Sequence, residues 1–160
     1  IGSAHQGLIN LSKPVALLNR LNGGRLAIGD PQHVPAGHYA KQAMENLGLW
    51  PAVRDRLARQ INVRAVLAFV VRGESPLGII YATDAALSDA IRIAAIIPPE
   101  SHDPIVYTAA VVSEHSRPDV LQFFDSLNQD HAGNVFERYG FGVVRTATDD
   151  QISKTMPSMP

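Results

Sequence analysis

The chain has 160 residues, of which 46% are hydrophobic and 18% charged, a composition typical of a soluble globule with one domain or two small lobes. The formal net charge of -1, with 14 basic residues scattered along the sequence, argues against nucleic acid or an anionic membrane as a partner. The absence of cysteine excludes disulfides and thiolate metal sites.

The first part of the sequence predicts a helix, a strand and a second helix. Pro14 to Leu21 has helical spacing and ends at residues that accept a positive φ angle, Asn22-Gly23-Gly24. Arg25 to Gly29 is the first clear strand, and Asp30-Pro31 ends it. The next helix begins at Pro35 and Ala36 and continues to Gly48.

The middle of the sequence predicts two further helices and a buried strand. Helical spacing from Trp50 through Val53 and Leu57 predicts a helix that continues to Ile61. Asn62 is a suitable N-cap for the next helix, Val63 to Val71. Leu77 to Tyr81 is a nearly continuous apolar run, as in a strand covered on both faces.

The remaining segments continue the alternation of helix and strand. A short helix over Ala85 to Ala90, capped by Thr83 or Asp84, is followed by expected strands at Ile91 to Ile97 and Ile105 to Val112. Two C-terminal helices, Pro118 to Leu127 and Gln129 to Tyr139, precede a polar tail. This order predicts the α/β class, with a mixed, mostly parallel sheet flanked by helices.

The common catalytic and cofactor motifs are absent. The sequence contains no GxxxxGK[ST], GxGxxG, GxSxG or HExxH pattern. The six histidines include no i, i+4 pair on a helix, so we interpret them as solvated residues and expect no metal held by side chains. Carboxylates at turns usually serve as caps, so we expect neither a catalytic residue nor a cofactor.

Three positions are candidate ligand-binding residues: Ala36, Val63 and Tyr81. Ala36 and Val63 each begin a predicted helix, and Tyr81 ends a predicted strand, which are the places where open α/β sheets bind ligands. Each position taken singly also fits an ordinary first-turn or sheet-edge residue. Together, two helix N-termini and a hydroxyl would supply donors without an acceptor, and such a set favours a fully deprotonated oxyanion. A protonated anion would leave its own hydroxyl unpaired, at a cost of about 1 to 3 kcal/mol.

Four separated segments resemble the periplasmic molybdate-binding proteins of ABC importers. They occur in the family's order and roughly its spacing: Gly29 to Lys41 (GDPQHVPAGHYAK), Asn62 to Arg64 (NVR), Pro76 to Asp84 (PLGIIYATD) and Phe136 to Phe141 (FERYGF). The resemblance implies a periplasmic-binding-protein-like fold, a periplasmic location and a membrane permease as partner. It also implies molybdate or tungstate as the ligand, held by the backbone N–H groups of Ala36 and Val63 and by the Tyr81 hydroxyl.

The resemblance also implies a division of the chain into three parts. Residues 8–112 correspond to the second, anion-binding lobe, residues 113–143 to a helical return to the first lobe, and residues 144–160 to a loose tail. Nothing in residues 1–16 is similar to the serine-bearing loops of the first lobe, and Ile1 is not a start methionine. We therefore expect a processed or truncated form that binds its oxyanion more weakly than an intact family member.

Without the first lobe, the apolar stripes on the two C-terminal helices would be exposed to solvent. We therefore expect a homo-oligomer with these helices at the contact. Two other functions remain open at this stage. One is a small enzyme that acts on a phosphate or sulfate ester through Tyr81 and Asp84. The other is a folded interaction module without a ligand.

Overall fold

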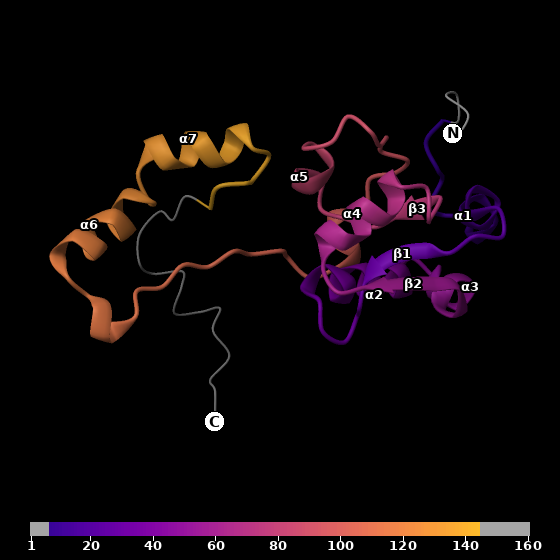
Figure 1. Cartoon of the computed structure of the whole chain (residues 1–160), viewed down its shortest axis with the longest axis horizontal. Helices are drawn as coiled ribbons and strands as arrows, with labels where there is room; N and C mark the ends of the chain where they lie inside the picture. The colour runs from indigo at the N-terminus through magenta and orange to yellow at the C-terminus, as the bar shows by residue number, and fades with distance from the viewer. Residues whose placement is uncertain (1–6, 145–160) are drawn as a thin grey trace. The chain divides into compact units, whose positions relative to one another are not determined.

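The computed structural model describes residues 7–144. The chain divides into two compact units, with the division between Tyr107 and Thr108. Figure 1 labels the helices and strands of both units, and each unit is described by itself below.

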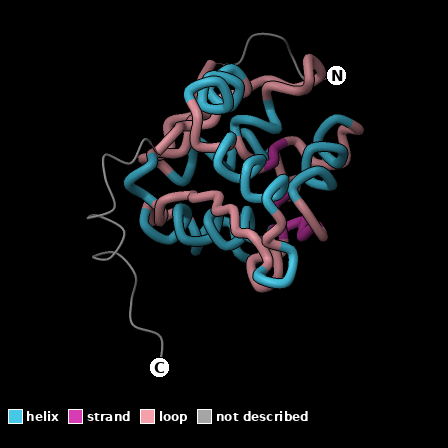
Figure 2. Tube along the Cα trace, turned by 90° about the vertical axis from the view of Figure 1, so that its left-hand side faces the viewer, coloured by secondary structure: helices cyan, strands magenta, loops and turns pink. Residues whose placement is uncertain are grey.

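The first unit is a small parallel sheet with helices. Its elements, in chain order, are α1 (Pro14–Leu21), β1 (Leu26–Gly29), α2 (Pro35–Asn46), α3 (Trp50–Val53), β2 (Leu57–Gln60), α4 (Val63–Val71), β3 (Leu77–Gly78) and α5 (Ala82–Ala85). Short 3-10 turns occur at Arg54–Arg56 and Pro99–Ser101. The strand order is β2-β1-β3, and both neighbours run parallel to β1. Figure 2 shows these strands as short segments in a chain of helices and loops.

Alternate residues of β1 face two different hydrophobic clusters. Leu26 and Ile28 pack with residues of α1, α2 and the region around α3. Ala27 packs with Ala58 of β2 and Val66 of α4 on the other face. Successive side chains of a strand point to opposite faces, so α2 and α4 cover opposite faces of the sheet, in agreement with Figure 1.

The helix predictions made from local start and stop signals are confirmed. The bounds of α1 and α4 are those predicted, and α2 begins at Pro35. Asn22 adopts the left-handed conformation with φ 46° at the end of α1. The Asn62 side chain accepts a hydrogen bond of 2.8 Å from the Ala65 N–H, as an N-cap does.

The helix predicted to continue from Trp50 to Ile61 is wrong beyond Val53. Leu57–Gln60 instead forms β2, whose residues pair in register with Leu26–Gly29. Leu57 and Ile61 do have helical spacing, but the backbone hydrogen bonds to β1 and the burial of Ala58 favour a strand. Tertiary pairing therefore overrides a weak local pattern.

The region after β2 differs from its prediction in two further places. Only Leu77–Gly78 is strand, although the Ile79 N–H still donates to the Ala27 carbonyl at 2.9 Å. The following helix is Ala82–Ala85 rather than Ala85 to Ala90. Its N-cap residue is Tyr81 and no side chain caps it, so the predicted capping by Thr83 or Asp84 is also wrong.

The strands predicted at Ile91 to Ile97 and Ile105 to Val112 are not present as paired strands. Ile9 donates to the Ala94 carbonyl at 2.7 Å, but no ladder develops among the described residues. A run of apolar β-branched residues shows only that the side chains favour a strand. A strand also needs a neighbouring strand that binds its backbone N–H and C=O groups. The described sheet is consequently all parallel rather than mixed.

The second unit contains two helices of nine residues each, α6 (Pro118–Ser126) and α7 (Asp130–Arg138), after a short 3-10 turn at Ser113–His115. Both helices confirm the C-terminal predictions to within a residue or two. The predicted tail falls almost entirely on residues 145–160, which lie outside the described residues. Within residues 7–144, no helix has the length and hydrophobicity needed to span a bilayer.

Candidate functional site

The candidate site lies at the edge of the sheet where the strands end. Because all three strands are parallel, their carboxyl ends meet at one edge, and α2, α4 and α5 follow β1, β2 and β3 there. Ala36 is the second residue of α2, Val63 is the first residue of α4, and Tyr81 is the N-cap residue of α5. The structure therefore brings the three predicted residues to the same edge. The strand order reverses at β1, as at the ligand crevice of open α/β sheets.

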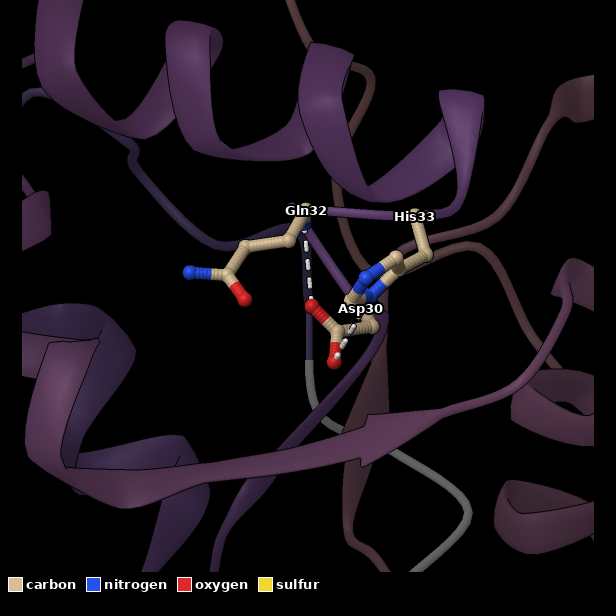
Figure 3. Close-up of polar contacts among 3 residues, drawn as sticks. All are labelled: Asp30, Gln32 and His33. Atoms are coloured by element: carbon tan, nitrogen blue, oxygen red, sulfur yellow. Dashed lines mark hydrogen bonds and ion pairs between the residues drawn. The ribbon is translucent and has the colours of Figure 1, made fainter.

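The turn between β1 and α2 is ordered by Asp30. Figure 3 shows its carboxylate facing the backbone of Gln32 and the ring of His33. The Gln32 N–H donates to Asp30 Oδ1 at 2.9 Å, and the His33 and Val34 N–H groups donate to the Asp30 carbonyl. The Asp30 N–H donates to the Gln60 carbonyl at 2.8 Å. These bonds tie the turn before α2 to the end of β2, and so fix where α2 begins.

Two glycines allow α2 to approach β1 closely. A Cβ atom at Gly37 would overlap the carbonyl group of Gly29, and a Cβ at Gly29 would press into the Val34 side chain at 2.6 Å. Any larger residue at position 37 would require the backbone to move. This contact positions the first turn of α2, including Ala36, directly against the end of β1.

The Ala36 and Val63 N–H groups are available as hydrogen-bond donors. Neither group donates to a partner among the described residues, whereas the Gly37 N–H donates to Val34 O and the Ala65 N–H to Asn62 Oδ1. Such groups at a helix N-terminus carry part of the positive end of the helix dipole. They can therefore bind an anion through the backbone, without a lysine or arginine.

Tyr81 is a half-buried phenol with an acidic and aromatic environment. Partial burial, followed by electrostatic contributions from Tyr107, Tyr39 and Asp84, raises the pKa of Tyr81 above its usual value of 10.0. The hydroxyl thus keeps its proton at neutral pH and can donate a hydrogen bond. Sequence reasoning missed the influence of Tyr39 and Tyr107 on the pKa of Tyr81, because no local motif connects three such distant positions.

The remaining features of the described residues give no sign of another site. Residues 7–144 contain no group of three or more His, Asp or Glu side chains that could hold a metal ion. A pocket of about 390 Å³ lies elsewhere, lined by Leu8, Ile9, Asn10, Leu11, Ser12, Leu47, Ala95, Ile96 and Pro98. It shares no residue with the candidate site.

Comparison with solved structures defines the class of protein. The chain is similar to a substrate-binding domain that is assigned to a molybdenum ABC transporter of Clostridium difficile, with a TM-score of 0.66 and 27% identity. That match covers 80% of this chain and 57% of the solved chain. The fold is thus an α/β lobe of the periplasmic-binding-protein type, as the sequence predicted.

Comparison of sequences then defines the family. The chain belongs to the bacterial extracellular solute-binding proteins, whose sequence model matches residues 4–142. It is 47% identical over 123 residues to the molybdate-binding protein ModA of Escherichia coli, covering 77% of this chain and 48% of that protein. It is 45% identical over 124 residues to ModA of Haemophilus influenzae, covering 78% and 49%.

These comparisons also bear on the functions left open by the sequence. The chain spans about half the length of these two curated relatives. The family consists of binding proteins and the relatives are named for binding, which confirms the prediction that this protein is not an enzyme. The ester hydrolase built on Tyr81 and Asp84 is therefore not favoured.

Proposed function

We propose that this chain binds molybdate or tungstate as part of the solute-binding component of an ABC importer. The oxyanion is a transported ligand, not a cofactor, and the membrane permease of the importer is the partner that receives it. The periplasm is the compartment in which such a component acts. The similarity to proteins named molybdate-binding supports the ligand, and the family supports the role in solute binding.

The proposal is supported by the placement of three candidate donors after parallel strands that end at one edge of the sheet. The N–H groups of Ala36 and Val63 begin α2 and α4, and the Tyr81 hydroxyl precedes α5. Ala36 is only 6% exposed, so its N–H lies in a partly desolvated environment where a hydrogen bond to an anion is stronger.

The same donors predict selectivity for a fully deprotonated anion. At neutral pH molybdate and tungstate carry no proton, whereas every phosphate ion carries at least one. The phosphate hydroxyl would find no acceptor among the three donors, and an unpaired buried hydroxyl costs about 1 to 3 kcal/mol. Sulfate is also deprotonated but smaller, so it tests whether the site selects by size.

The direct test is a calorimetric titration of the protein with molybdate, tungstate, sulfate and phosphate. We expect heat with molybdate and tungstate and much weaker binding of phosphate. Absence of binding to all four anions would overturn the proposed function, and equal affinity for phosphate would overturn the donor-only argument.

A substitution at Tyr81 sharpens this test. Tyr81→Phe removes one donor, worth about 1 kcal/mol, and should weaken molybdate binding about fivefold. Tyr139→Phe, an exposed tyrosine after α7, is the matched control and should bind as the unchanged protein does. An unaltered affinity in Tyr81→Phe would remove Tyr81 from the site.

Two finer features also belong to this proposal. Residues 8–112 act as the anion-binding lobe, and this lobe supplies only part of the donors around a tetrahedral anion. Residues 113–143 supply helices whose exposed apolar side chains mediate self-association.

A further inference from the structure

The turn that links α1 to β1 contains the residue pair Asn22-Gly23. Asn22 ends α1 in the left-handed conformation, with φ 46° and ψ 48°, and its N–H donates to the Leu18 and Asn19 carbonyls. Gly23 also has a positive φ, of 80°, and both residues of the pair are exposed. The proposed oxyanion site uses neither residue, so the chemistry of this turn is independent of the proposed function.

Both groups that could react in this pair are accessible. A backbone nitrogen that attacks the side-chain amide of the preceding asparagine closes a five-membered ring, and glycine has no Cβ to hinder the approach. The space around Gly23 is open, since a Cβ there would meet nothing within 4 Å. Within residues 7–144, neither the Gly23 N–H nor the Asn22 side-chain amide forms a hydrogen bond. Water therefore reaches both the nitrogen and the amide.

The attack requires rotation about the Cα–C bond of Asn22, which brings the Gly23 nitrogen to Asn22 Cγ. The hydrogen bond that closes the turn, from the Gly24 N–H to the Leu21 carbonyl at 2.7 Å, must open first. Leu21 is only 1% exposed and holds the end of α1 in the core. Gly23 and Gly24 have wide conformational freedom and can absorb the rotation beyond it. The turn can thus open by fraying of the helix end, without unfolding of α1.

The other asparagines of the chain lack this combination of features. Each of them is followed by a residue with a side chain: Asn10, Asn19, Asn46, Asn62, Asn128 and Asn134. Asn62 is the closest match, because it is exposed as well. However, its side chain is engaged by the Ala65 N–H at 2.8 Å, and the β-branched Val63 follows it. Asn62 is therefore a control within the same chain.

We propose that Asn22 is a site of spontaneous deamidation, with water as the co-reactant. The deprotonated Gly23 nitrogen bonds to Asn22 Cγ, the Cγ–Nδ2 bond breaks, and the amide nitrogen leaves as ammonia, so that a cyclic succinimide remains. Water then adds to one of the two ring carbonyl carbons, and the Gly23 nitrogen regains a proton. Opening at Cγ gives aspartate, and opening at the main-chain carbonyl gives isoaspartate, whose backbone contains an additional methylene. No step is an oxidation or a reduction.

Either product changes the end of α1. A new carboxylate lies at the C-terminal end of the helix, where the helix dipole is negative, and the formal charge of the chain becomes one unit more negative than -1. Isoaspartate also lengthens the link between Leu21 and Leu26, which belong to the same hydrophobic cluster. Deamidation should therefore weaken the packing of α1 against β1.

The test incubates the full chain at neutral and at weakly acidic pH and then maps its tryptic peptides by mass spectrometry. Trypsin releases residues 21–25, in which Asn22 is the only asparagine, and residues 60–64, in which Asn62 is the only one. Replacement of an amide NH₂ by a hydroxyl should add about 1 Da to the first peptide, whereas the second stays unchanged. Conversion should be faster at neutral pH, because the attacking nitrogen must lose its proton. Methylation of the first peptide by an isoaspartyl methyltransferase detects isoaspartate.

The same incubation in guanidinium chloride gives the rate for the unfolded chain. If residues 21–25 convert in the unfolded chain but stay unchanged in the folded protein, the fold protects Asn22 and the proposal is wrong. Equal conversion of residues 60–64 in the folded protein would also overturn it, because the reaction would then not depend on this turn.

Two variants test the effect on α1. Asn22→Gly removes the reactive amide, permits the positive φ and should keep the midpoint of thermal unfolding. Asn22→Asp supplies the charge without the additional methylene and should lower that midpoint, and incubated protein that contains isoaspartate should unfold at a lower temperature still. Equal midpoints for fresh and fully converted protein would contradict the weakened packing of α1.

Discussion

At the scale of single residues, the proposed site depends mainly on where two backbone N–H groups lie. Substituting Ala36 or Val63 does not delete an N–H, so these positions are tested best through residues that fix the backbone around them. Gly37 is such a residue, because the Gly29 carbonyl occupies the space where its Cβ would lie.

Gly37→Ala should therefore both destabilise the protein and weaken oxyanion binding. Overpacking of this kind costs about 1 to 3 kcal/mol, and relief of the overlap requires α2 to move away from β1 with its Ala36 N–H. Urea unfolding measures the first effect and calorimetry with molybdate the second. Gly7→Ala is the control, since a Cβ at Gly7 meets nothing within 4 Å. Unchanged stability and affinity in Gly37→Ala would contradict the close contact.

At the scale of elements, substitutions at the start of α4 can separate the effect of helix capping on stability from the effect of charge on anion binding. Asn62 accepts from the Ala65 N–H and immediately precedes the Val63 N–H. Asparagine and aspartate cap helices about equally well, but only aspartate adds a negative charge beside the proposed anion site.

Asn62→Ala should lower the free energy of unfolding by about 1 kcal/mol through loss of the cap. Asn62→Asp should keep the stability of the unsubstituted protein but weaken molybdate binding, because the new carboxylate repels the dianion. Thermal unfolding and calorimetry on the two variants measure these effects. If Asn62→Asp binds molybdate as tightly as the unsubstituted protein, the anion does not lie at the start of α4.

At the scale of the whole molecule, the second unit presents large apolar side chains to solvent. Phe123 is 66% exposed on α6, and Leu121 on α6 and Phe136 on α7 are also exposed. Burial of each such side chain contributes roughly 1.5 to 3 kcal/mol, which favours a contact between copies.

We therefore expect a dimer or higher oligomer in light scattering at high protein concentration, dissociating on dilution toward the 17.3 kDa chain. Phe123→Asp should shift this equilibrium toward the monomer, whereas Leu87→Asp, at an exposed position in the first unit, should not. A monomer at every concentration, without binding of a dye specific for apolar patches, would refute the self-association.

The sequence by itself determined the features that have local causes. Pro35 permits a helix to begin and Asn62 caps one, and both act on backbone groups within four residues. For this reason α2 and α4 began where predicted, and the N–H groups of Ala36 and Val63 could be proposed as donors from the sequence. The family was also identifiable, because its four segments occur in order along the chain.

Only the tertiary structure decided which extended segments became strands and which side chains met. Leu57–Gln60 became β2 because β1 lay beside it, while Ile91 to Ile97 remained without a ladder despite its stronger strand pattern. Ser101 and Asp103 came to lie along α2 only because the Asn46 and Gln42 side chains bind their backbone groups. Backbone pairing and side-chain contacts of this kind join residues distant in the chain, and local propensity contains no information about which distant partner will be present.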